Sequence, residues 1–205
     1  DLTAERRRSL TRRVRLLVAA TITYNVIEGI IAISAGTIAG STALIGFGLD
    51  SVIEVSSAAI VAWQFSAPNP ETRERIALRV IAYSFFALAA YVAFESIRAL
   101  LGSGEVEHST IGIVLASVSL LVMPFLSYAQ RRAGRELGST TAVADSKQTL
   151  LCTYLSAVLL VGLVLNSLFG WSWADPIAGL IIAAVAVREG RQAWKGDACC
   201  APIVQ

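Results

Sequence analysis

Apolar residues fill six long stretches of the sequence, and most polar residues lie in the short connectors between them. A membrane-spanning helix needs roughly 20 mainly apolar residues, and most of the stretches approach or exceed that length. The pattern predicts an all-α, polytopic membrane protein with six transmembrane helices. We expect one transmembrane domain over residues 14–195, a basic tail at 1–13 and a short tail at 196–205. The six stretches are residues 14–36, 42–65, 76–101, 110–128, 142–169 and 173–187.

The basic residues alternate between the connectors and set the predicted orientation. Of the 17 Lys and Arg residues, all except Arg98 fall beside the N-terminal tail, the second and fourth connectors or the C-terminal tail. Cytoplasmic segments of membrane proteins carry an excess of Lys and Arg. We therefore expect both termini in the cytoplasm. The expected location is the cell membrane, as a multi-pass protein, and in a bacterium this would be the inner membrane.

Composition supports a membrane environment over a soluble one. The 205 residues are 55% hydrophobic and only 16% charged, whereas soluble domains carry about a quarter charged residues. The same values exclude a disordered chain. The net charge of +2 makes nucleic acid a poor partner. Three cysteines cannot all pair with one another, so reduced thiols are expected.

Two acidic residues lie inside the second stretch, where a charge is costly. Asp50 and Glu54 are four residues apart and so share one helix face. A charged side chain at the bilayer centre costs roughly 2.5–3.5 kcal/mol on insertion scales. Two like charges at this spacing also repel, unless a bound cation or a shared proton neutralises them. The pattern favours a cation site that also handles protons, with permanent protonation of both acids as the alternative.

The fifth stretch repeats the four-residue spacing with Gln148 and Cys152. If this face meets Asp50 and Glu54, the four side chains form a metal site near the middle of the membrane. A mixed set of oxygen and sulfur ligands suits Zn²⁺, Cd²⁺ or Hg²⁺ better than Mg²⁺ or Ca²⁺. In the alternative interpretation Cys152 is a small buried apolar residue.

Further polar residues offer supporting roles. Asn25 and Glu28 share a face of the first stretch with Thr21, so they are candidates for a proton relay or for support beside the acids, as is Asp145. Glu28 is equally compatible with a hydrogen bond to a neighbouring helix. Adjacent Cys199 and Cys200 in the C-terminal tail offer cytoplasmic metal capture.

Other polar residues have structural interpretations. The spacing of Glu95 and Arg98 predicts a local ion pair. Asp175, before Pro176, is expected to cap the sixth helix. Small residues around the start of the second stretch, Gly48 among them, permit close helix packing.

Several motifs resemble the cation diffusion facilitators, six-helix divalent-metal/proton antiporters. They are the run from Gly48 to Glu54, Ala144 with Asp145, the pair Gln148 and Cys152, and the run from Trp173 to Asp175. Where this family often has His and Asp in the fifth helix, this chain has Gln148 and Cys152. The resemblance implies export from the cytoplasm, a homodimer through membrane helices, and a branch without the family's C-terminal cytoplasmic domain.

The expected function is therefore efflux of a Zn²⁺-like divalent transition metal in exchange for protons, with Cd²⁺, Co²⁺ and Hg²⁺ as further substrates. The expected partners are the lipid bilayer, the metal ion and protons, with no prosthetic group. An intramembrane protease is disfavoured because the single histidine, His108, lies in a connector. A non-transporting membrane partner or regulatory subunit, or a cation channel, remains the alternative.

Overall fold

The computed structural model describes residues 4–65, 70–102, 107–137 and 140–195, and these fold into α-helices without a strand. Some side chains within these helices also lie outside the description. The protein is all-α, as predicted. The helices are α1 (Ala4–Ala39), α2 (Thr42–Phe65), α3 (Pro70–Leu101), α4 (Thr110–Leu137), α5 (Thr140–Phe169) and α6 (Ala174–Lys195).

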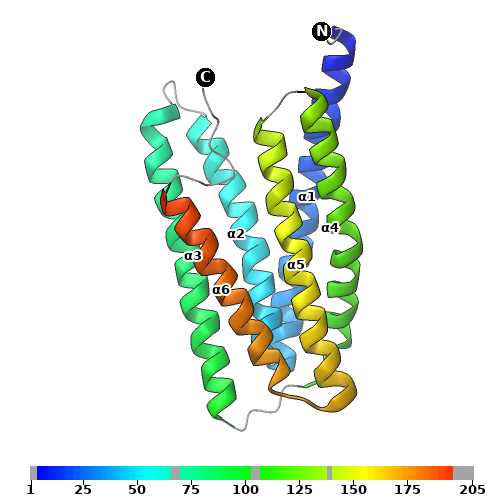
Figure 1. The fold of residues 1–205 in the computed structure, drawn as a ribbon, viewed down its shortest axis with the longest axis vertical. Helices are drawn as coiled ribbons and strands as arrows, with labels where there is room; N and C mark the ends of the chain where they lie inside the picture. Colours follow the sequence, from blue (N-terminus) through cyan, green and yellow to red (C-terminus); the bar gives the residue numbers. More distant parts are fainter. Residues whose placement is uncertain (1–3, 66–69, 103–106, 138–139, 196–205) are drawn as a thin grey trace.

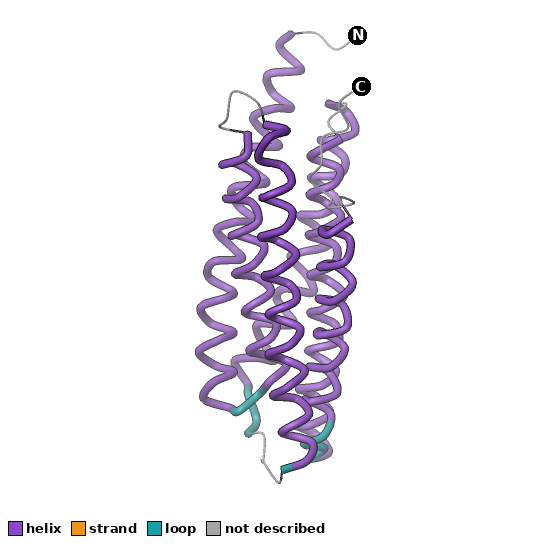
Figure 2. The backbone as a smooth tube through the Cα atoms, turned by 90° about the vertical axis from the view of Figure 1, so that its left-hand side faces the viewer, coloured by secondary structure: helices purple, strands orange, loops and turns teal. Residues whose placement is uncertain are grey.

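The helices form one up-and-down bundle around α2. Figure 1 shows that α1 begins and α6 ends at the same end of the bundle. The view in Figure 2 shows the helices running along one long axis. The central helix α2 packs against α1, α3, α5 and α6, while α4 packs against α1 and α5. A residue on α2 can therefore meet side chains from both halves of the chain.

The described helices account for a multi-pass membrane protein. Five of them are long and apolar enough to cross a membrane by length and composition, and α6 is not among these five. Its 22 residues include Asp175 near the start and charged residues in the last two turns. Large apolar side chains face outward, such as Leu101 at 85% and Leu121 at 76% exposure. Such a surface is costly in water and favourable against lipid chains.

Several helices extend beyond the apolar stretches that predicted them. The helix α1 begins at Ala4 instead of residue 14, and α4 continues to Leu137 instead of residue 128. Apolar stretches mark the part of a helix that fits the hydrocarbon layer, whereas the backbone hydrogen bonds continue into the polar region. These extensions carry most of the Arg residues of both helices.

The helices α1 and α2 approach closely because glycines lie at their contact. A Cβ atom on Gly48 would lie 2.8 Å from Ile33 Cγ1 and 2.9 Å from Ile33 N. A Cβ on Gly29 would lie 3.2 Å from the Gly48 carbonyl oxygen. The predicted close packing at Gly48 is therefore present, and it brings the polar face of α1 next to the acidic face of α2.

Two local predictions have different outcomes. The Glu95–Arg98 ion pair is confirmed, with 2.7 Å between Oε2 and Nη2. Asp175 is buried, but its carboxylate lies at the start of α2 instead of capping its own helix. It accepts hydrogen bonds from Ser41 Oγ at 2.5 Å and from the Ala43 backbone N–H at 3.4 Å. The prediction that Asp175 caps α6 was wrong. Its partner Ser41 is more than 130 residues away in the chain, so no local pattern could reveal the contact.

Candidate metal site

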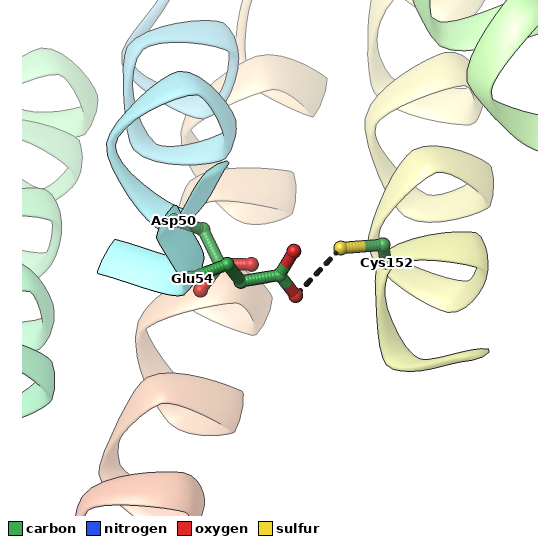
Figure 3. Close-up of side chains that lie close together, drawn as sticks. All are labelled: Asp50, Glu54 and Cys152. Atoms are coloured by element: carbon green, nitrogen blue, oxygen red, sulfur yellow. Dashed lines mark hydrogen bonds between the residues drawn. The ribbon is translucent and has the colours of Figure 1, made fainter. Parts of the chain in front are cut away.

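Three potential metal ligands from α2 and α5 meet inside the bundle. A carboxylate oxygen of Asp50, one of Glu54 and the Cys152 Sγ all lie within 4.8 Å of one another. Figure 3 shows Glu54 extending from α2 towards Cys152 on α5, with Asp50 on the same face of α2. Asp50 is 8% exposed and Cys152 is 1% exposed. The helical spacing brings the two acids together, and tertiary packing adds the sulfur.

The Glu54 carboxylate receives hydrogen bonds from two neighbouring helices. Cys152 Sγ donates to Glu54 Oε1 at 2.8 Å, and Asn25 Nδ2 on α1 donates to Glu54 Oε2 at 2.6 Å. Glu54 thus joins α1, α2 and α5 at one point. The Oδ1 atom of Asn25 is buried and has no hydrogen-bond partner.

No basic residue neutralises these acids within the described part of the chain. Its ion pairs are Arg6–Glu136, Glu95–Arg98 and Arg132–Glu136, and each involves substantially exposed arginines. Asp50 and Glu54 take part in none of them. With no basic partner among the described residues, a bound cation or protons would offset the negative charge of the cluster.

Glu28 forms a separate polar contact in the bundle. Its carboxylate accepts hydrogen bonds from Ser51 Oγ of α2, at 2.9 Å, and from Ser119 Oγ of α4. The Tyr24 hydroxyl lies 2.7 Å from Ser119 Oγ. Glu28 is 1% exposed, and it ties α1 to both α2 and α4. Sequence reasoning missed Ser119, since nothing in its local pattern distinguishes it from other serines in apolar helices.

The remaining predicted residues are less well defined. Gln148 and Asp145 belong to α5, but their side chains lie outside the described residues. Cys199 and Cys200 also lie outside the described residues. Ligation by Gln148, relay by Asp145 and metal capture by the two tail cysteines stay predictions.

The donor set matches the chemistry of a divalent transition metal. Zinc binds thiolate sulfur at about 2.3 Å and carboxylate oxygen at about 2.0–2.2 Å, so tetrahedral ligands lie roughly 3.5 Å apart. Ligand atoms within 4.8 Å of one another need only a small inward movement to reach this spacing. Two hard oxygen donors and one soft sulfur donor favour Zn²⁺-like ions over Mg²⁺ and Ca²⁺.

Comparison with known proteins gives a consistent result. A family model described as the cation efflux transmembrane domain matches residues 18–195. The chain is 34% identical to the cation-efflux pump FieF of Shewanella oneidensis over 119 residues, 57% of this chain and 39% of that protein. It is 26% identical to an uncharacterized transporter of Synechocystis over 158 residues, 72% of this chain and 51% of the relative.

A third relative carries a more specific name. The chain is 25% identical over 109 residues to a cadmium, cobalt and zinc/H⁺–K⁺ antiporter of Bacillus subtilis. This match covers 53% of this chain and 34% of that antiporter. The chain thus spans about half or less of the length of these three relatives.

Proposed function

Because the chain belongs to the cation efflux transmembrane family, a family of transporters, we propose that it exports a divalent transition metal in exchange for protons. Asp50, Glu54 and Cys152 are the proposed transport site. The observation that carries this proposal is the convergence of their three ligand atoms within 4.8 Å, inside a membrane bundle. Gln148, one turn before Cys152, is the proposed fourth ligand.

Charge balance explains why this site would exchange a metal for protons. With both acids ionised, the cluster carries at least two negative charges and has no basic partner among the described residues. A divalent cation offsets two negative charges, and protons on the same groups offset them as well; when Cys152 binds the metal as a thiolate, its proton is released and later returned with those of the acids. Metal ligands must be deprotonated to bind, so protons arriving from the other side of the membrane displace the ion. Each form of the site is then close to neutral, as the hydrocarbon layer requires.

The position of the site between two helices suits alternating access. A hydrogen bond joins Glu54 on α2 to Cys152 on α5, and α2 and α5 come from different halves of the chain. Small relative movements of the helices would open the cluster to one face or the other. We infer that both chain ends face the cytoplasm, because basic residues dominate the end of the bundle where α1 begins and α6 ends. A homodimer through the membrane helices stays a prediction.

Transport into proteoliposomes tests the proposal. The purified chain is reconstituted, and uptake of Zn²⁺, Cd²⁺, Co²⁺, Mn²⁺ and Hg²⁺ is measured with the lumen more acidic than the bath. We expect Zn²⁺ to accumulate and a protonophore to abolish the accumulation. Asp50→Ala should lower uptake about tenfold or more, because it removes a ligand. Cys152→Ser should lower Cd²⁺ and Hg²⁺ uptake more than Co²⁺ uptake, because the lost sulfur is the soft donor.

Glu95→Gln is the matched control, since it also removes a membrane carboxylate but one that pairs with Arg98. It should transport normally. Normal Zn²⁺ uptake by Asp50→Ala would contradict the proposed site. Uptake that ignores the pH gradient would instead indicate a cation channel, and absence of both uptake and metal binding would favour a non-transporting membrane subunit.

A further inference from the structure

Asn25 lies beside Glu54, one of the proposed metal ligands, and the oxygen of its side-chain amide lacks a hydrogen-bond partner among the described residues. The side chain is only 3% exposed, and its Nδ2 donates to Glu54 Oε2 at 2.6 Å. Its Oδ1 is buried and has no hydrogen-bond partner among the described residues. Leaving a buried polar atom unpaired costs about 1–3 kcal/mol. A bound metal ion would supply the partner that the described residues do not.

The unpaired oxygen lies close to one proposed ligand, Glu54. Standard amide geometry separates the oxygen and nitrogen of one amide by about 2.2 Å. The Asn25 Oδ1 atom therefore lies no more than about 4.8 Å from Glu54 Oε2. Glu54 is itself one of the three residues whose ligand atoms converge between α2 and α5.

The backbone holds Asn25 in this place. Asparagine has a short side chain, so it reaches Glu54 only because α1 and α2 approach closely at Gly29 and Gly48. Gly29 is one helical turn after Asn25, on the same face of α1. The position of the amide thus follows from tight helix packing instead of from a flexible side chain.

We propose that Asn25 Oδ1 is a ligand of the transported metal, so that α1 contributes to the site together with α2 and α5. This inference rests on the proposed function, because it requires that a metal binds at Asp50, Glu54 and Cys152. The amide oxygen supplies a donor without adding negative charge to the two carboxylates and the Cys152 thiolate that would surround the divalent ion. The Nδ2 atom continues to hold Glu54 while Oδ1 faces the metal.

Metal binding by the purified chain in detergent tests this role without relying on transport. Zn²⁺ affinity is measured by titration calorimetry, and Co²⁺ absorption reports the ligands around the metal. Asn25→Leu keeps a side chain of similar size but offers no oxygen or nitrogen. We expect it to weaken Zn²⁺ binding by about 10- to 100-fold and to change the Co²⁺ spectrum. Asn25→Asp restores an oxygen and should recover affinity relative to Asn25→Leu.

Thr23→Val is the matched control on the same helix. Thr23 is exposed, and its hydroxyl donates only to the Ala19 carbonyl oxygen of its own helix. This variant should bind Zn²⁺ as the wild type does, with an unchanged Co²⁺ spectrum. If Asn25→Leu does not fold, the Co²⁺ spectrum of Asn25→Asp tests the proposal instead. Absorption that indicates the wild-type number of ligands supports the proposal. Absorption that indicates a lower number of ligands overturns it.

The possible failures are distinguishable. Unchanged Zn²⁺ affinity in folded Asn25→Leu overturns the inference and leaves the proposed function intact. Weaker binding with an unchanged Co²⁺ spectrum also overturns it, since Asn25 would then only orient Glu54. If the wild type binds neither Zn²⁺ nor Co²⁺, the proposed function itself fails.

Discussion

Replacing Gly48 with alanine tests whether close packing of α1 and α2 builds the site. The added Cβ would lie 2.8 Å from Ile33 Cγ1, 2.9 Å from Ala32 Cβ and 2.9 Å from Ile33 N. Favourable contacts between carbon atoms lie at about 3.5–4.0 Å. One of the three close atoms belongs to the backbone, so a rotamer change cannot relieve the clash. The two helices must separate locally by roughly 0.5–1 Å.

The free energy of unfolding should fall. Overpacking of this kind costs about 1–3 kcal/mol, whereas exchanging glycine for alanine within a helix gains about 0.5–1 kcal/mol. The clash is the larger effect, so we expect a net loss of about 1–2 kcal/mol. Gly29→Ala is a graded comparison, because its Cβ would lie 3.2 Å from the Gly48 carbonyl oxygen and 3.3 Å from Val52 Cγ2. A shift of a few tenths of an ångström suffices there, and the two effects should nearly cancel.

The same separation should weaken metal binding. The Asn25–Glu54 hydrogen bond is 2.6 Å long, and an added 0.5–1 Å takes it to or beyond the length at which such bonds remain strong. We expect about a tenfold loss of Zn²⁺ affinity in Gly48→Ala and a smaller loss in Gly29→Ala. Thermal unfolding in detergent and titration calorimetry measure the two effects. Wild-type stability and wild-type affinity in Gly48→Ala would refute the packing argument.

Two further substitutions test polar contacts elsewhere in the bundle. Asp175→Ala should lower the free energy of unfolding by about 1–3 kcal/mol, because the Ser41 hydroxyl and the Ala43 backbone N–H lose their buried acceptor. An unchanged unfolding temperature in detergent would argue against these hydrogen bonds. Glu28→Ala should also lower the free energy of unfolding, by about 1–2 kcal/mol, because Ser51 and Ser119 lose the buried acceptor that joins α1 to α2 and α4. The loss should be the smaller of the two, since Ser119 keeps its contact with the Tyr24 hydroxyl and Ser51 its contact with the Phe47 carbonyl oxygen. Unfolding no different from that of the Glu95→Gln control would argue against these contacts.

Local patterns in the sequence were sufficient for the helices and for the acidic pair. Six apolar stretches correspond to six helices, because a membrane leaves the backbone few alternatives to helical hydrogen bonding. Asp50 and Glu54 had to share a face, and Glu95 had to lie within reach of Arg98, because helical geometry fixes neighbours three and four residues apart.

The sequence patterns did not predict which residues of different helices contact one another. The spacing of Gln148 and Cys152 indicated a polar face on α5, but only packing brings the Cys152 sulfur to 2.8 Å from Glu54. The partner of Asn25 followed from the close approach at Gly48, and Asp175 caps α2 instead of its own helix.

Local patterns in the chain thus predicted which segments are helical and which are apolar enough to cross a membrane, and they marked the residues that we propose carry the chemistry. The tertiary structure alone decided which of those residues meet. The difference follows from how far apart in the chain the interacting residues lie. Backbone hydrogen bonding and burial in lipid act within one helix and leave a periodic pattern in the sequence. Side-chain contacts between helices depend on the rotation and separation of whole helices, which the summed packing of many residues sets.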